Sequence, residues 1–111
     1  MGKKMKIKIT TLIICLLLPA EAMAMTGVVE KVDVCRAGNV IFKTSTGWYV
    51  NARYVSGVMV KEKDAVSGKL KNFGIRVVTT ADGRQGKYYI LNFVKNRVDA
   101  INAFCGAGIS W

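Results

Sequence analysis

Glycine recurs through this chain at intervals that leave room only for short extended segments. The five glycines from Gly27 to Gly68 are separated by 11, 9, 10 and 11 residues, and the single proline, Pro19, lies before all of them. The segments between them are rich in valine, threonine and aromatic residues, which favour strands. Turn signals about every 8–12 residues indicate a small β-sandwich or β-barrel. The segments differ from one another, so the spacing marks turns and not an internal repeat.

The first 24 residues have the pattern of a secretory signal peptide. Four lysines within the first eight residues precede an unbroken apolar run over 12–18, Pro19 ends the run, and small residues alternate after it. The run is far shorter than the roughly 20 apolar residues that span a bilayer. We therefore expect residues 1–24 to be removed by cleavage after Ala22 or Ala24. The mature protein is then periplasmic or secreted, with no transmembrane segment.

The mature region, 25–111, is long enough for one small domain and too short for two. It contains 13 of the 17 lysines and arginines and 6 of the 7 acidic residues, which gives a net charge of about +7. A charge this far from zero keeps a small domain soluble, and it also suits an anionic partner.

Two of the three cysteines, Cys35 and Cys105, remain after cleavage. An even pair of cysteines in a short exported chain indicates a disulfide bond. Closing a loop of about 70 residues contributes roughly 4 kcal/mol in the chain-entropy model. The bond would also hold the chain end in place, so that Ile109 and Trp111 form a last apolar strand or plug.

Alternating side chains predict five strands in the mature region. In the third of them, Val50 and Ala52 share an apolar face with the aromatic residues on either side, whereas Asn51 and Arg53 should point away from the core. The Asp-Gly pair in the loop that ends at Gly86 favours a hairpin between the last two strands. The five predicted strands cover 28–35, 40–44, 48–55, 75–80 and 87–94.

Two segments have apolar residues at helical spacing. In 58–73, Met59, Val66, Leu70 and Phe73 can share one face of a helix, although Gly68 would weaken it. In 95–104, apolar residues recur at spacings of three and four residues. This apolar stripe begins on the preceding strand and continues up to Cys105. We expect a helix in each segment.

Three strands, a helix and two further strands is the element order of the oligonucleotide/oligosaccharide-binding (OB) fold. The chain resembles small exported bacterial proteins of this architecture and, more distantly, the B subunits of pentameric toxins. The resemblance covers the order of elements and the presence of a disulfide. It implies a mainly β protein with one or two short helices: an OB-like five-stranded barrel closed by one disulfide. It also implies the binding of surface sugars, without assigning any binding residue.

The residues needed for common kinds of catalysis are missing. Histidine is absent, which removes the usual general base and the commonest metal ligand. The six acidic residues of the mature region fit solvated positions and turns, and the disulfide leaves no thiol for zinc. We therefore expect no enzymatic activity, no cofactor and no metal.

Aromatic rings interleaved with lysine and arginine form stacking surfaces for sugars or bases. The sequence therefore predicts a binding module for a glycan or another anionic envelope component. A nucleic-acid-binding OB-like domain and a structural or assembly subunit of an oligomer are the alternative interpretations. The candidate ligand-binding residues are Trp48, Tyr49, Arg53, Arg84, Lys87 and Tyr88.

Overall fold

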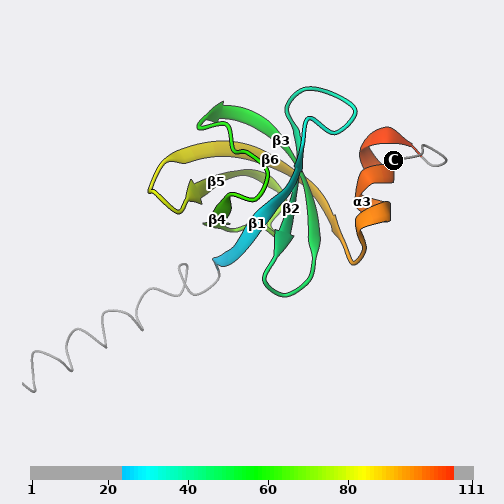
Figure 1. Cartoon of the computed structure of the whole chain (residues 1–111), viewed down its shortest axis with the longest axis horizontal. Coiled ribbons are helices and arrows are strands. Elements are labelled where there is room, and N and C mark those ends of the chain that lie inside the picture. The colour runs from blue at the N-terminus through cyan, green and yellow to red at the C-terminus, as the bar shows by residue number, and fades with distance from the viewer. Residues whose placement is uncertain (1–23, 107–111) are drawn as a thin grey trace, which may run out of the picture.

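In the computed structural model, which describes residues 24–106, six strands form a closed barrel with helix α3 against its outer wall (Figure 1). Neighbouring strands are antiparallel and follow the ring order β1-β2-β3-β6-β5-β4, with β4 pairing back to β1. The elements are β1 (Met25–Val32), β2 (Asn39–Thr44), β3 (Tyr49–Gly57), β4 (Ala65–Gly68), β5 (Gly74–Thr80), β6 (Gln85–Val94) and α3 (Arg97–Cys105).

The predicted mainly β fold, with a barrel and a disulfide, is confirmed, but the barrel has six strands in place of five. The five predicted strands correspond to β1, β2, β3, β5 and β6, each with ends displaced by three residues at most. The helix expected over 95–104 is confirmed as α3. The predicted signal peptide up to residue 23 and the apolar residues Ile109 and Trp111 lie outside the described residues.

The prediction of a helix over 58–73 is wrong, because this segment contains strand β4. Val66 and Leu70, which could share a helix face, instead both reach the barrel interior from β4 and the turn after it. Strand β4 pairs with β1 on one side and β5 on the other, and so closes the ring. Long-range pairing of this kind overrides a helical spacing that only a few apolar residues support.

The barrel interior is one continuous hydrophobic core. Phe42 and Tyr88 are its largest members, and their rings meet edge to face with centroids 5.6 Å apart. Both rings are at most 1% exposed, so the strands are held together by nearly complete burial of apolar surface. The other buried members are Val29, Val40, Val50, Ala52, Val60, Val66, Leu70, Val78 and Ile90.

Two glycines allow strands to approach each other more closely than side chains would permit. A Cβ on Gly68 would lie 2.5 Å from the carbonyl oxygen of Val77, and one on Gly57 would lie 2.6 Å from that of Gln85. Gly57 also has a φ of +82°, which strains any residue with a side chain. Part of the glycine spacing therefore reflects close strand packing, in addition to the turns that it predicts.

Helix α3 covers part of the outer wall and creates a second, smaller core. Val34 and Ile41 pack there against Ala100 and Ile101 of the helix. Asn51 was expected to point away from the barrel core. It does leave the barrel interior, but it is 1% exposed beneath α3, where its side-chain amide donates a 2.7 Å hydrogen bond to the carbonyl of Ala100.

Both ends of α3 are fixed. Asn96 caps its start by accepting a 2.7 Å hydrogen bond from the backbone N–H of Asp99, as N-cap asparagines commonly do. At the other end, Cys105 is bonded to Cys35 in the loop after β1, with the two Cα atoms 5.6 Å apart. The disulfide therefore ties the end of the helix to the loop after β1, across 70 residues of sequence.

Candidate functional site

Three aromatic rings from three different turns and strands meet at one place on the barrel. Trp48, just before β3, contacts Phe93 of β6 edge to face, with ring centroids 5.6 Å apart. Phe73, just before β5, stacks on Phe93 with centroids 5.2 Å apart and an angle of 20° between the planes. Phe93 packs against the barrel core, whereas Phe73 is 60% exposed. The core thus supports an aromatic surface that is open to solvent.

Two lysines lie over the same rings. The Nζ atom of Lys71 lies 3.8 Å from the centroid of the Trp48 ring, and that of Lys95 lies 4.4 Å from it. Lys71 also lies 5.1 Å from the centroid of Phe93. Cation–π attraction holds an ammonium group over an aromatic face at such distances. We refer to these five residues, Trp48, Lys71, Phe73, Phe93 and Lys95, as the Trp48 cluster.

Neither lysine of the Trp48 cluster is neutralised by a carboxylate within residues 24–106. The ion pairs recorded there join Arg84 to Asp82 and Arg97 to Glu30. Within residues 24–106, two ammonium groups therefore share one ring without a carboxylate at ion-pair distance. Such an arrangement can accept an anionic group, and the exposed ring beside it can support an apolar face of the same ligand.

The turn between β2 and β3 fixes the position of Trp48. The hydroxyl of Thr44, a residue only 3% exposed, accepts a 3.0 Å hydrogen bond from the Trp48 backbone N–H. The Trp48 carbonyl in turn accepts a 2.8 Å bond from the Thr44 N–H. Thr46 adds a hydroxyl contact of 3.1 Å to Thr44. The backbone of Trp48 is therefore anchored on the barrel wall.

The six residues predicted to bind ligand do not form one site. Trp48 alone belongs to the Trp48 cluster, and Tyr49 packs beside the second core with Lys43 5.5 Å from its ring. Arg84 pairs with Asp82 in the turn between β5 and β6. Arg53 and Lys87 are exposed on the outer wall, on neighbouring strands β3 and β6.

The structure corrects the interpretation of Tyr88, which is 1% exposed inside the barrel and cannot form a surface for ligands. Its hydroxyl donates a 2.9 Å hydrogen bond to the carbonyl of Val58 and accepts a 3.0 Å bond from the N–H of Val60. Tyr89, the next residue, is the one that faces outward, with 46% exposure. Tyr88 therefore anchors the segment between β3 and β4.

Replacing Tyr88 with phenylalanine should make the stability of the barrel less sensitive to alkaline pH. Burial raises the pKa of Tyr88 above its usual value of about 10. Above pH 10 the unfolded chain ionises this phenol while the folded chain keeps it neutral, so folding loses stability as the pH rises. We expect wild type to lose more unfolding free energy than Tyr88→Phe between pH 8 and about 10.5.

Urea unfolding at the two pH values measures this difference. At pH 8 the variant should be less stable by about 1–2 kcal/mol, because the polar groups of Val58 and Val60 lose their partner. Both proteins share the same lysines, so lysine titration cancels in the comparison. Equal losses in the two proteins would contradict the proposed role of Tyr88.

Four residues of the Trp48 cluster were not among the predicted site residues. Lys71 and Phe73 lie in the segment that was expected to be helical, and Lys95 was expected to begin the last helix. The sequence contains a signal for them, because lysine and aromatic residues lie close together in 69–73 and 93–95. That these two segments adjoin Trp48 follows only from the ring order of the strands.

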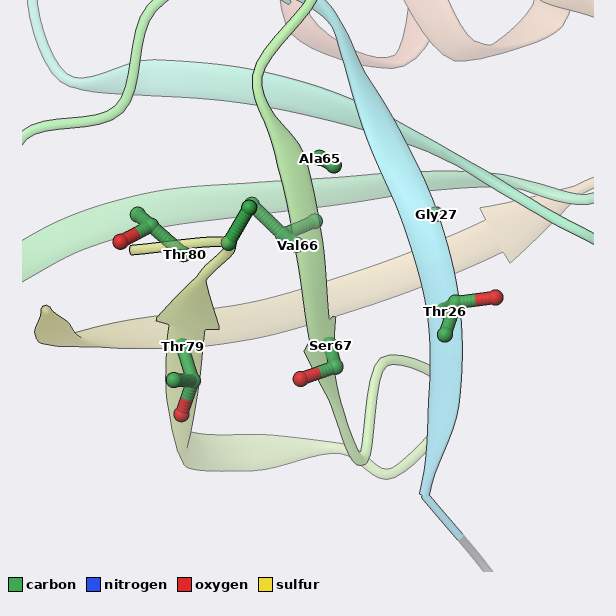
Figure 2. A pocket seen from close by; sticks show the side chains of 8 residues that line it. Thr26, Gly27, Ala65, Val66, Ser67, Thr79 and Thr80 are labelled. Carbon is green, nitrogen blue, oxygen red and sulfur yellow. The ribbon is translucent and has the colours of Figure 1, made fainter. Parts of the chain in front are cut away.

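A second candidate is a shallow hollow on the outer wall of β1, β4 and β5, with a volume of about 230 Å³ (Figure 2). Thr26, Ser67 and Thr79 contribute hydroxyl groups from these three strands, and Gly27 and Ala65 also line the hollow. None of its lining residues carries a charge. It offers hydrogen bonds without an anchor for an anion, so the Trp48 cluster is the stronger candidate.

No protein-family model matches the chain, and comparisons with curated proteins and with solved structures find no significant match. The fold and the site therefore define the class: a small, disulfide-bonded β-barrel with an aromatic and basic surface. Within residues 24–106, no three acidic or cysteine side chains gather closely enough to hold a metal ion. In the same part of the chain, no helix has the length and apolar character needed to cross a membrane.

Proposed function

We propose that the mature chain is an exported, non-catalytic binding module whose Trp48 cluster holds an anionic carbohydrate or a similar envelope component. The observation that supports this most is the placement of two lysines over the Trp48 ring, beside an exposed Phe73. A sugar ring has an apolar face that can lie on an aromatic side chain. Phosphate or carboxylate groups on that sugar would pair with Lys71 and Lys95.

The disulfide supports export. Bonds of this kind persist in oxidising compartments such as the periplasm and the extracellular space, and are rare in the cytosol. The N-terminal signal pattern leads to the same proposal independently, and the first strand begins at Met25, just after the expected cleavage sites.

The roles of the carboxylates support a non-catalytic function. Five of the six acidic residues in 24–106 already form an ion pair or accept a hydrogen bond from a nearby residue. Glu30 and Asp82 pair with arginines, and the other three accept hydrogen bonds from backbone or asparagine N–H groups. Only Glu62 has no such contact, and it is exposed in the loop before β4. A single exposed carboxylate lacks the partner that general acid–base chemistry needs. The three that bind N–H groups are Asp33, Asp64 and Asp99.

A glycan and single-stranded nucleic-acid array tests the proposal with mature protein at two salt concentrations. We expect binding to glycans that carry phosphate or carboxylate groups, and a loss of about ten-fold or more in the variant Phe73→Ser. Val98→Ser is the matched control, because Val98 is similarly exposed, at 62%, but lies on α3. Its binding should equal that of wild type.

The salt dependence separates the two kinds of anionic ligand. A single-stranded nucleic acid that contacts several phosphates should lose affinity steeply, by about 0.7 in the log–log slope for each phosphate. A glycan with one anionic group should show a slope below about one. Preferred binding to nucleic acid with a steep slope would mean that nucleic acid, and not a glycan, is the ligand. Absence of binding to either class would refute the proposal that the chain is a binding module.

A further inference from the structure

The outer wall of β3, β6 and β5 carries a patch of exposed apolar side chains that α3 leaves uncovered. Val55, Ile75, Val77 and Tyr89 are between 45% and 53% exposed. Tyr89 pairs in register with Ile75, and Val77 with Lys87, so the patch is continuous across β5 and β6. Contiguous exposed apolar surface of this kind commonly marks a contact with another molecule.

Positive charge lies within this patch, and negative charge is absent from its strands. Arg53 pairs in register with Tyr89, and Lys87 with Ser56, so one basic residue accompanies each end of the apolar row. The sequences of β3, β5 and β6 contain no aspartate and no glutamate. We call the outward residues Arg53, Val55, Ile75, Val77, Lys87 and Tyr89 the β6 face.

The β6 face also contains a shallow hollow of about 210 Å³. It is lined by Val77, Lys87 and their neighbours around Gly57 and Gly86, where two glycines face each other across β3 and β6. This hollow is large enough for one apolar side chain of a partner beside Lys87. The ring of strands in 24–106 is closed, so a partner must bind through side chains and not by adding a strand.

Charge disfavours a second copy of the chain as the occupant of this surface. A second copy packed symmetrically would bring the two sets of Arg53 and Lys87 together, with no carboxylate on these strands to neutralise them.

We propose that the β6 face docks an acidic segment of another protein in which aliphatic side chains alternate with carboxylates. The carboxylates pair with Arg53 and Lys87, and the aliphatic groups cover Val55, Ile75, Val77 and Tyr89. Tyrosine and arginine are among the residue types that contribute most to protein interfaces. This surface is separate from the Trp48 cluster, so the inference does not depend on the proposed ligand.

Site-specific photo-crosslinking in the cells that make the protein tests this proposal on the full chain. The photoreactive residue benzoylphenylalanine replaces Tyr89, and a control chain carries it at Val98 on α3. We expect a protein crosslink from position 89 and not from position 98. Mass spectrometry of the crosslinked peptide should find acidic and aliphatic residues interleaved at the attachment point.

Second substitutions in the position-89 chain identify the contacts. Lys87→Glu and Ile75→Ser should each lower the crosslink yield by about ten-fold or more, because one reverses a charge and the other removes an apolar contact at the interface. Lys61→Glu, an exposed change in the loop before β4, should leave the yield unchanged. Circular dichroism confirms that each variant is folded.

Several outcomes would overturn the proposal. Three concern the identity of the partner: a crosslink to a second copy of the chain, crosslinks to lipid only, or a crosslinked peptide without carboxylates. Two concern the yield: no crosslink at all, or a yield that neither Lys87→Glu nor Ile75→Ser changes. Loss of glycan binding in Phe73→Ser with normal crosslinking from position 89 would show that the two surfaces act independently.

Discussion

Replacing both Cys35 and Cys105 with serine should lower the free energy of unfolding by about 3–4 kcal/mol. The bond closes a loop with a sequence separation of 70 residues, for which the chain-entropy model gives roughly 4 kcal/mol. It also holds α3 over Val34 and Ile41, which lose their cover if the helix detaches. Against a usual total of about 5–15 kcal/mol, the loss is a large share of the stability of a domain this small.

Urea denaturation of the mature variant and of wild type measures the effect. Wild-type protein treated with a reducing agent is the matched control, because it loses the bond without any change of sequence. It should lose nearly as much stability as the double serine variant. A loss below about 1 kcal/mol in both samples would show that the packing of α3 on the barrel suffices without the bond.

Reversing the charges of the Trp48 cluster with Lys71→Glu and Lys95→Glu together should weaken glycan binding by about 100-fold or more. Each lysine is expected to make a charge-assisted hydrogen bond, worth about 1.5–3 kcal/mol, and every 1.4 kcal/mol is ten-fold in affinity. The reversed side chains also repel the anion. Neither lysine has an ion-pair partner in the described residues, so the change should leave the folded state intact.

Lys61→Glu with Lys63→Glu is the matched control for this prediction. It alters the net charge by the same amount in the exposed loop before β4, away from the Trp48 ring. Isothermal titration with the best glycan from the array should give unchanged affinity for the control. An equal loss in both double variants would mean that net charge alone attracts the ligand and that the Trp48 cluster has no special role.

The strands could be predicted from the sequence because each is a local pattern. Alternation in β3 and the Asp-Gly hairpin signal between β5 and β6 depend on residues close together in the chain. Strand β4 escaped this reasoning, since four residues are too short for an alternation and Val66 and Leu70 have helical spacing. Its pairing with β1 and β5 is a property of the closed ring.

The candidate site was only partly predictable for the same reason. A mixture of aromatic and basic residues was visible in the sequence, and Trp48 was named as part of it. Phe73 and Phe93 are separated by 20 residues, and their stacking depends on how β5 and β6 pair. Tyr88 and Tyr89 are adjacent and chemically identical, so the register of β6 alone decides which one is buried.

The pairing of β3 with β6 has a consequence for how the chain can assemble during synthesis. Tyr49 lies opposite Val94, and the other residue pairs between β3 and β6 are also far apart in the sequence. The ribosome therefore synthesises the β6 partner well after the β3 residue. While the chain is still being made, β1 to β5 can form only an open, curved sheet with apolar side chains uncovered. Completion of the barrel must wait for the last part of the described chain, and contacts so distant in sequence slow folding. An incomplete chain should therefore be a preferred target for chaperones and proteases.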